Sequence, residues 1–389
     1  MKITAVRART LRNPLHTAVS FEPPATAMLG AIGPFGNGVS VPSEPAALTV
    51  VEIETDSGLT GIGTVGGRNI GATKIIEGHL SQLLIGEDAS RIEWLWNLMY
   101  KSTHQYGMRG AVIMAIGGVD IALWDLAGKR AGLPVYDLIG GKTKPKIPLY
   151  MSTLNSAAGL ENMLANATEA VEDGFTALKY FFNKGPNHGP AGARAEIEAV
   201  RELRNAVGPD VQLMLDPHFK WDLPYAMRMM GKLAEFEIEW IEEPIPSDDL
   251  AGHEALADMK AIPLAAGELS RTRFDYLDFI NAGVYFLQPD INRVGGFSEV
   301  LKICGLAASY SRAVCPHQGW LHSYHLVTAM SCCPIGEFFP RSDPVPGNSL
   351  IWEVLDGEPK PVGGMIEIPD RPGFGWTINE EKMELYAMP

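Results

Sequence analysis

From about residue 145 the chain repeats one pattern, in which a short apolar run ends in a polar residue and a helical stretch follows. The apolar runs cover Ile147–Ser152, Thr176–Phe181, Val211–Asp216, Glu237–Glu242, Ile262–Glu268, Val284–Asp290, Arg312–His317 and Ile335–Phe339. The helical patterns between them cover Arg194–Val207, Leu223–Glu235, Asp249–Lys260, Arg273–Ala282 and Phe297–Ser309. Strands that alternate with helices pair in parallel, because each crossover returns the chain to the same edge. Eight runs predict a closed (β/α) barrel, since an open doubly wound sheet usually has fewer strands.

The N-terminal part of the chain follows a different pattern. A Gly- and Pro-rich stretch over 13–45 precedes two apolar runs, Leu48–Ile53 and Leu59–Val65, which a short turn separates. Further along, helical spacing is clearest in Ala111–Arg130. A hairpin followed by helices is typical of a separate α+β unit.

These patterns divide the chain into three parts. We predict an α/β protein with an α+β capping domain over residues 1–140 and a modified (β/α) barrel over 141–345. The last part, 346–389, is rich in Gly and Pro, and we expect it to return to the cap.

Polar residues end the predicted strands, and in a barrel all carboxyl ends of the strands face one common mouth. In chain order these residues are Lys179, Asp216, Glu242, Glu268, Asp290, His317 and Glu337. Asp216, Glu242 and Glu268 follow one another at intervals of 26 residues, which places them on neighbouring strands. Three converging carboxylates repel one another unless a cation lies among them, and oxygen ligands suit a hard ion such as Mg²⁺. The spacing therefore predicts a divalent metal site.

Glu243 directly follows Glu242 in the sequence Trp240–Pro244. Because side chains alternate along a strand, only one of the two glutamates faces inward. The 26-residue interval favours Glu242 as the inward residue.

His317 lies one predicted strand after Asp290, so the two can form a His–Asp dyad. The carboxylate would orient the imidazole ring and raise its basicity, as a general base requires. Glu337 on the eighth strand is then a candidate proton or hydrogen-bond donor, and His218 is a candidate second acid. We expect His322 and His325, on a predicted helix, to be packing or capping residues.

Composition excludes several classes of function. The formal net charge of −14 over 389 residues disfavours nucleic acid and anionic membranes as partners. The chain opens without an apolar signal segment and has no run of 18 uncharged apolar residues, so we expect a cytoplasmic protein. The four cysteines lack a C-x-x-C spacing, and we interpret them as buried, reduced thiols.

One motif suggests a different function. The segment Gly61–Gly66 matches the letters of the dinucleotide-binding pattern G-x-G-x-x-G, which would indicate an NAD-dependent oxidoreductase. That pattern requires a strand before it and a helix N-terminus within it, whereas these glycines lie in the return strand of a hairpin. We therefore expect no dinucleotide site.

Taken together, the motifs resemble the enolase superfamily and, within it, the mandelate racemase-like subgroup. The resemblance spans nearly the whole chain and rests on Glu54–Gly61, Gly118–Lys129, Leu138–Gly141, Trp240–Pro244, Ala266–Glu268, Gln288–Gly296 and Pro372–Gly375. It implies removal of a proton α to a carboxylate, with Mg²⁺ stabilising an ene-diolate. Residue by residue it implies Mg²⁺ on Asp216, Glu242 and Glu268, acid/base chemistry by Asp290–His317, and Glu337 near the substrate carboxylate. It also implies that loops around residues 14–40 close the site.

Two positions depart from the subgroup's patterns. Its racemases place Lys-x-Lys at the end of the second barrel strand, where this chain has Lys179-Tyr180-Phe181 and so lacks the second base. The segments 179–186 and Tyr106–Gly110 resemble the L-rhamnonate dehydratase branch, yet Leu269 stands where that branch usually has a histidine.

These features predict a Mg²⁺-dependent acid-sugar dehydratase that forms a 2-keto-3-deoxy acid. A racemase, epimerase or cycloisomerase of the same superfamily is the alternative. The expected partner is a small-molecule carboxylate, and we expect a homo-oligomer.

Overall fold

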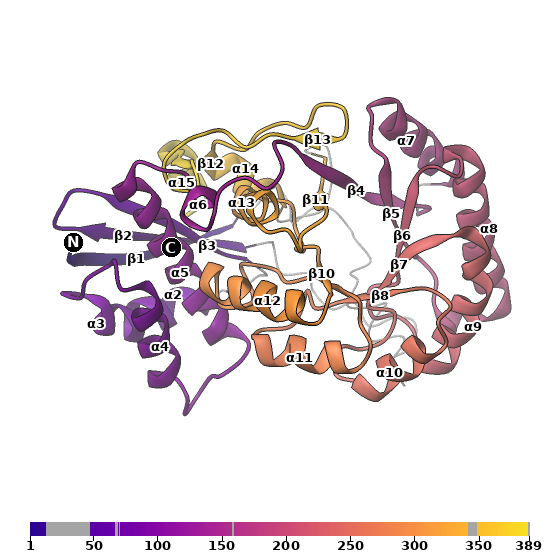
Figure 1. Ribbon diagram of the computed structural model, residues 1–389, viewed down its shortest axis with the longest axis horizontal. Coiled ribbons are helices and arrows are strands. Elements are labelled where there is room, and N and C mark those ends of the chain that lie inside the picture. The colour runs from indigo at the N-terminus through magenta and orange to yellow at the C-terminus, as the bar shows by residue number, and fades with distance from the viewer. Residues whose placement is uncertain (13–46, 67–68, 70, 158, 341–347, 388–389) are drawn as a thin grey trace.

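The computed structural model describes residues 1–12, 47–66, 69, 71–157, 159–340 and 348–387. Eight parallel strands form its larger part (Figure 1): β4 (Ile147–Asn155), β5 (Ala177–Phe181), β6 (Gln212–Asp216), β7 (Ile238–Glu242), β8 (Leu264–Ala266), β9 (Phe286–Leu287), β10 (Ala313–Val314) and β11 (Gly336–Phe338). They pair in chain order from β4 to β10, and β11 returns to pair with β4. Between β10 and β11 the described residues form no ladder, and the Val314 N–H donates to the Cys332 carbonyl at 2.9 Å. The predicted (β/α) barrel is confirmed, with a seam between its seventh and eighth strands.

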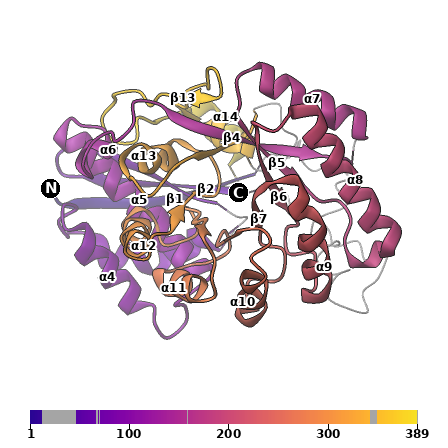
Figure 2. The ribbon, with the colours of Figure 1, turned by 45° about the vertical axis from the view of Figure 1, so that its right-hand side comes forward.

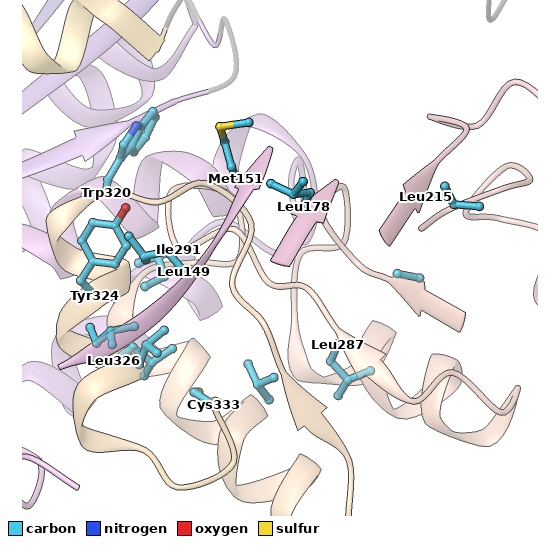
Figure 3. Close-up of a cluster of buried hydrophobic side chains, with 14 of the residues drawn as sticks. Leu149, Met151, Leu178, Leu215, Leu287, Ile291, Trp320, Tyr324, Leu326 and Cys333 are labelled. Atoms are coloured by element: carbon cyan, nitrogen blue, oxygen red, sulfur yellow. The ribbon is translucent and has the colours of Figure 1, made fainter. Parts of the chain in front are cut away.

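Helices cover the outside of the barrel, as the sequence predicts (Figure 2). They are α7 (Leu160–Glu172), α8 (Gly189–Val207), α9 (Leu223–Leu233), α10 (Leu250–Asp258), α11 (Arg273–Asn281), α12 (Phe297–Ser309) and α13 (Leu321–Ala329), with short 3₁₀ turns over Pro186–His188 and Ala234–Phe236. Side-chain caps start two of them: Asp222 accepts from the Tyr225 N–H, and Asp249 accepts from the Gly252 N–H. Apolar faces of strands and helices pack together in the large core that Figure 3 shows in part, around Leu178, Leu215 and Leu287.

The N-terminal unit packs one long helix against an antiparallel sheet. The sheet contains β1 (Ile3–Arg12), β2 (Ala47–Thr55) and β3 (Thr60–Val65); the helices are α2 (Ala72–Ile75), α3 (Ser81–Leu84), α4 (Ile92–Ser102), α5 (Ala111–Ala131) and α6 (Val135–Leu138), with a π-helical turn over Ile76–Leu80. By length and composition α5 alone, among the described residues, could cross a membrane, but 83% of its apolar window is buried within the molecule. It is the central core helix of this unit, in contact with β2 and β3.

The G-x-G-x-x-G segment lies in β3 and serves this packing. A Cβ at Gly61 would lie 2.1 Å from the Ala122 carbonyl oxygen, and one at Gly63 would lie 2.1 Å from that of Gly118. Both carbonyls belong to α5, so these glycines allow the helix to approach the strand closely. The pattern has a structural explanation that involves no phosphate.

The C-terminal segment runs between the two parts and contains α14 (Asn348–Val354), β12 (Leu355–Asp356), β13 (Met365–Ile366), β14 (Thr377–Ile378) and α15 (Glu380–Tyr386) (Figure 1). β13 pairs antiparallel with β4 of the barrel, whereas Ala387 forms a bridge with Leu11 of the cap sheet. The segment thus contacts both units. The exact domain limits stay a prediction, and the loops around 14–40 lie outside the described residues.

Candidate active site

The mouth of the barrel is a layer of polar side chains directly above its apolar interior. The interior layer takes one buried residue from each strand or its flank: Tyr150, Ala177, Met214, Trp240, Ala265, Phe286, Cys315 and Ile335. Because alternate residues of an extended chain face the same side, the residue two positions later also faces inward. These residues are Ser152, Lys179, Asp216, Glu242, Gly267, Gln288, His317 and Glu337, and all but the glycine are polar and buried. The structure therefore gathers most of the predicted site residues at one level.

Lys179 is the cation among the carboxylates of this layer. Its Nζ lies 2.8 Å from Glu242 Oε1, 3.0 Å from Glu337 Oε1 and 3.3 Å from Asp216 Oδ2. Burial acts to lower the pKa of the Lys179 amine, but the three carboxylates outweigh it and raise this pKa well above its usual value. Lys179 is therefore charged and links four strands.

His317 and Asp290 form the predicted dyad. His317 Nδ1 lies 3.0 Å from Asp290 Oδ2, and Nε2 lies 3.0 Å from Glu268 Oε2. Burial acts to lower the pKa of His317, but Glu268 and Asp290 raise it to about 10. Arg293 joins both carboxylates, with its Nε 3.0 Å from Asp290 Oδ2 and its Nη1 3.3 Å from Glu268 Oε1. The ring is thus held from both of its nitrogens.

Glu242 and Glu243 are both buried, although strand alternation predicted that only one faces inward. Gln288 Nε2 donates to Glu242 Oε2 at 2.6 Å, so Glu242 belongs to the mouth as expected. β7 ends at Glu242, and the backbone of Glu243 turns to a φ of 36°. The Glu243 carboxylate then accepts from the Gly267 N–H at 2.7 Å, and its other oxygen has no partner. Burial and the neighbouring Glu268 charge raise its pKa well above the usual range.

Two further candidates lie at the edges of this layer. Glu337 Oε2 accepts from the Gln318 N–H at 2.7 Å. Burial acts to raise the pKa of Glu337, but the Lys179 charge outweighs burial and lowers this pKa. In this structure Glu337 is therefore a hydrogen-bond acceptor. His218 donates its backbone N–H to Asp216 Oδ1 at 2.8 Å and has a φ of 52°. Burial lowers the pKa of its ring to about 4. Its role as an acid stays a prediction.

His322 and His325 are confirmed as packing residues of α13. His322 Nε2 lies 2.8 Å from Asn292 Nδ2, and His325 Nδ1 accepts from the Tyr136 N–H at 3.1 Å. Both rings are buried. His325 connects α13 to the start of α6, and His322 contacts Asn292, whose N–H donates to Asp290 at 2.9 Å.

The donor set at the mouth has the chemistry that a hard divalent cation prefers, although the Asp216, Glu242 and Glu268 oxygens do not all lie within 4.8 Å of one another in this structure. Burial, followed by the charges of Glu242 and Glu268, raises the pKa of Asp216 well above its usual value, as expected where carboxylates lack sufficient positive charge. All the candidate ligand atoms are carboxylate oxygens, which Mg²⁺ prefers. Lys179, His317 and Arg293 offset only part of their negative charge here.

A (β/α) barrel with this charged mouth and an α+β unit at its side defines a class of enzyme, and comparison with known proteins identifies the family. Residues 38–140 match the mandelate racemase/muconate lactonizing enzyme N-terminal domain, and residues 162–382 match the enolase C-terminal domain-like family. The chain belongs to the mandelate racemase-like group of the enolase superfamily.

Individual relatives show how the chemistry of this group varies. The chain is 34% identical to an L-rhamnonate dehydratase from Saccharopolyspora erythraea over 85% of its own length and 83% of the relative's. L-Talarate dehydratase from Polaromonas sp. JS666, crystallised with Mg and L-glucarate, is 28% identical with a TM-score of 0.83 over 100% of this chain and 98% of that one. A racemase from Streptomyces coelicolor with bound magnesium is 26% identical with a TM-score of 0.84 over 99% and 100% of the two chains.

Sequence reasoning missed four residues of the mouth: Ser152, Gln288, Arg293 and Glu243. The two-residue step from the apolar interior would have found Gln288, because Phe286 lies below it. Arg293 lies in a motif noted for the resemblance, but no periodicity indicates that its guanidinium reaches Glu268. Glu243 could not be placed, because the left-handed turn that positions its carboxyl is not visible in the strand pattern.

Proposed function

We propose that this enzyme is a Mg²⁺-dependent acid-sugar dehydratase. The observation that carries the proposal is a mouth with one general base, the His317–Asp290 dyad, and no basic side chain where racemases have a second one. Phe181 occupies that position on β5, and its ring lies 5.0 Å from Lys179 Nζ. An aromatic ring cannot return a proton to the opposite face of a planar intermediate.

In the proposed reaction His317 takes the C2 proton of a 2,3-dihydroxy acid. Asp290 accepts from Nδ1 and thereby directs Nε2 toward the substrate. Lys179 supplies a fixed positive charge for the substrate carboxylate. The C3–O bond then breaks, the hydroxyl leaves as water with a proton from His317 or His218, and the enol tautomerises to a 2-keto-3-deoxy acid.

Asp216, Glu242 and Glu268 are the residues that would hold Mg²⁺. When bound, the ion supplies positive potential for the ene-diolate, whose second negative charge is otherwise prohibitive. It would also offset the Glu268 charge that raises the pKa of His317, leaving the imidazole neutral and able to act as a base.

A racemase or epimerase is the second candidate, favoured by the similarity to the Streptomyces racemase. The two functions differ in what happens after proton removal. A racemase needs a base on each face of the planar ene-diolate. In an elimination, loss of the 3-hydroxyl consumes the ene-diolate, so a second base is not required. Phe181 favours elimination.

The substrate is drawn from the aldonates and aldarates, the class to which the relatives' named substrates belong. L-Rhamnonate is one candidate, but Leu269, which directly follows Glu268 and is 38% exposed, places an apolar side chain beside the site. Homo-oligomerisation and a cytoplasmic location stay predictions.

The test is a screen of the purified protein with Mg²⁺ against acid sugars, with detection of 2-keto acids. The active compound is then incubated in D₂O and followed by NMR. Formation of a 2-keto-3-deoxy acid without the C2 epimer supports the proposal. Accumulation of the C2 epimer without keto acid would contradict it.

A further inference from the structure

Three cysteines lie together at the barrel seam, away from the mouth. Cys304 is on α12, and Cys332 and Cys333 lie between α13 and β11. One ligand atom from each lies within 4.8 Å of the other two, and the Sγ atoms of Cys304 and Cys333 are 4.0 Å apart. Among the residues that the structure describes, no other three His, Cys, Asp or Glu side chains bring ligand atoms this close together.

The backbone that carries two of these thiols is held in place from both sides. The Cys332 carbonyl accepts the Val314 N–H at 2.9 Å, which is the contact across the seam between β10 and β11. The Cys333 carbonyl accepts from Lys144 Nζ at 3.0 Å. Lys144 also donates to the Val327 carbonyl at 2.6 Å, so it fixes the end of α13 to the same point. The backbone that carries the two neighbouring thiols is therefore fixed.

Burial gives the cluster a closed side and an open side. Cys304 and Cys333 are fully buried members of the large hydrophobic core, in which Figure 3 labels Cys333. Cys332 is only half-buried and is the most exposed member of the cluster, and its Sγ lies 3.8 Å from the Cys304 carbonyl oxygen. Hydrogen bonds with Cys304 and Cys333, together with the nearby Lys144 charge, lower the pKa of the Cys332 thiol, whereas burial raises the pKa of Cys333 well above its usual value. A bound metal ion would displace the proton of the buried thiol.

The separation of the sulfurs matches a shared ligand better than a direct bond. A disulfide needs sulfurs about 2.0 Å apart, whereas thiolates around one tetrahedral ion, with Zn–S bonds of about 2.3 Å, are separated by about 3.8 Å. The observed 4.0 Å between the Cys304 and Cys333 sulfurs is close to the second value. A disulfide would also leave one of the three thiols unused.

We propose that Cys304, Cys332 and Cys333 form a binding site for a soft, thiolate-preferring d¹⁰ cation such as Zn²⁺, with a fourth position open on the Cys332 side. Such an ion would connect α12 to the segment before β11 where the sheet lacks a ladder. Because the site is away from the mouth, its occupancy should stabilise the barrel rather than supply chemistry.

The test uses Cd²⁺ as a spectroscopic probe on the full-length, reduced protein in saturating Mg²⁺, so that the carboxylates of the mouth are occupied. We expect a thiolate-to-Cd²⁺ charge-transfer band in the ultraviolet that saturates at one equivalent, together with proton release and a higher Tm. Cys304→Ser and Cys332→Ser should each weaken Cd²⁺ binding by on the order of 100-fold, because each removes one of three ligands.

Cys315→Ser is the matched control, because Cys315 lies inside the barrel and outside the cluster. This variant should give the same Cd²⁺ charge-transfer band as the wild-type protein. Cys332→Ser guards against misfolding, since Cys332 is the least buried of the three. A missing band, or a band that survives in both cluster variants, would overturn the proposal. So would two thiols consistently lost to a disulfide in freshly purified protein. The result does not depend on whether acid sugars are dehydrated.

Discussion

Two neighbouring layers of the same barrel have opposite characters. The lower layer, which includes Met214 and Trp240, is apolar and buried, whereas the layer two residues above it carries Asp216 and Glu242. The same strands and the same inward direction therefore produce a packed core at one level and a charged site at the next. A carboxylate is tolerated in the upper layer because Lys179 is there to balance it, and the lower layer has no such partner. The position of an inward-facing residue along its strand therefore determines whether it belongs to the packed core or to the charged site.

The largest loss of turnover is expected when the general base of the upper layer is removed. His317→Asn should lower turnover by about 10⁴-fold, because general-base catalysis is lost while the binding groups remain. Deuterium uptake at C2 should stop as well, and NMR in D₂O measures both effects. Asp290→Asn should lose less, since the ring keeps its nitrogen. His104→Asn, at an exposed histidine of the N-terminal unit, is the control and should retain full activity. Near-normal turnover in His317→Asn would reject the assignment.

The second test removes a carboxylate from the upper layer without changing its shape. Glu242→Gln should reduce turnover by about 10³-fold and weaken Mg²⁺ binding, because a negatively charged ligand is lost. Chelation of Mg²⁺ should abolish the activity of the wild-type enzyme, and added Mg²⁺ should restore it. Glu239→Gln lies on the same strand, β7, but is only half-buried, and it should leave both properties unchanged. Full activity in metal-free buffer would contradict the metal site.

A cavity in the lower layer should act on stability alone. Met214→Ala leaves an unfilled volume in the barrel interior and should lower the free energy of unfolding by about 2–5 kcal/mol. Turnover should persist at temperatures where the variant is folded, because Met214 lies below the reacting groups. Chemical denaturation measures the first quantity. Met227→Ala, at a residue 39% exposed on α9, is the matched control with little expected effect. A Met214→Ala protein that is as stable as wild type would show that the lower layer is not a packed core.

The smallest expected effect is a pH dependence of stability in metal-free protein. Glu268 and Asp290 raise the pKa of folded His317 to about 10, whereas an unfolded histidine titrates near about 6.5. The stabilisation from protonated His317 is therefore complete below the unfolded value and is lost as the pH rises toward the folded value. Wild type should lose more stability than His317→Asn between neutral and alkaline pH. Stability is measured by urea unfolding. Equal losses in the two proteins would mean that the neighbouring carboxylates do not stabilise the protonated form of His317.

Much of this protein could be predicted from its sequence because the relevant signals are local. Alternating strands and helices predicted the barrel, and the polar ends of the strands predicted Lys179, Asp216, Glu242 and His317 as residues of one mouth. A period of two residues fixes which side chains share a face, and the order of strands fixes which are neighbours. The glycines of β3 could likewise be recognised as strand residues, because their context lacked a helix N-terminus.

Only the tertiary structure decided which of these groups meet. Arg293 reaches both Glu268 and Asp290, and Glu243 turns back into the site through a left-handed backbone, although strand alternation indicated otherwise. The three cysteines come together across a seam that no sequence spacing reveals. Such contacts depend on strand register, on backbone turns beyond the strand ends and on how far long side chains extend. Those quantities are set by the packing of the whole barrel, whereas the periodicity that predicted the strands is set by neighbouring residues alone.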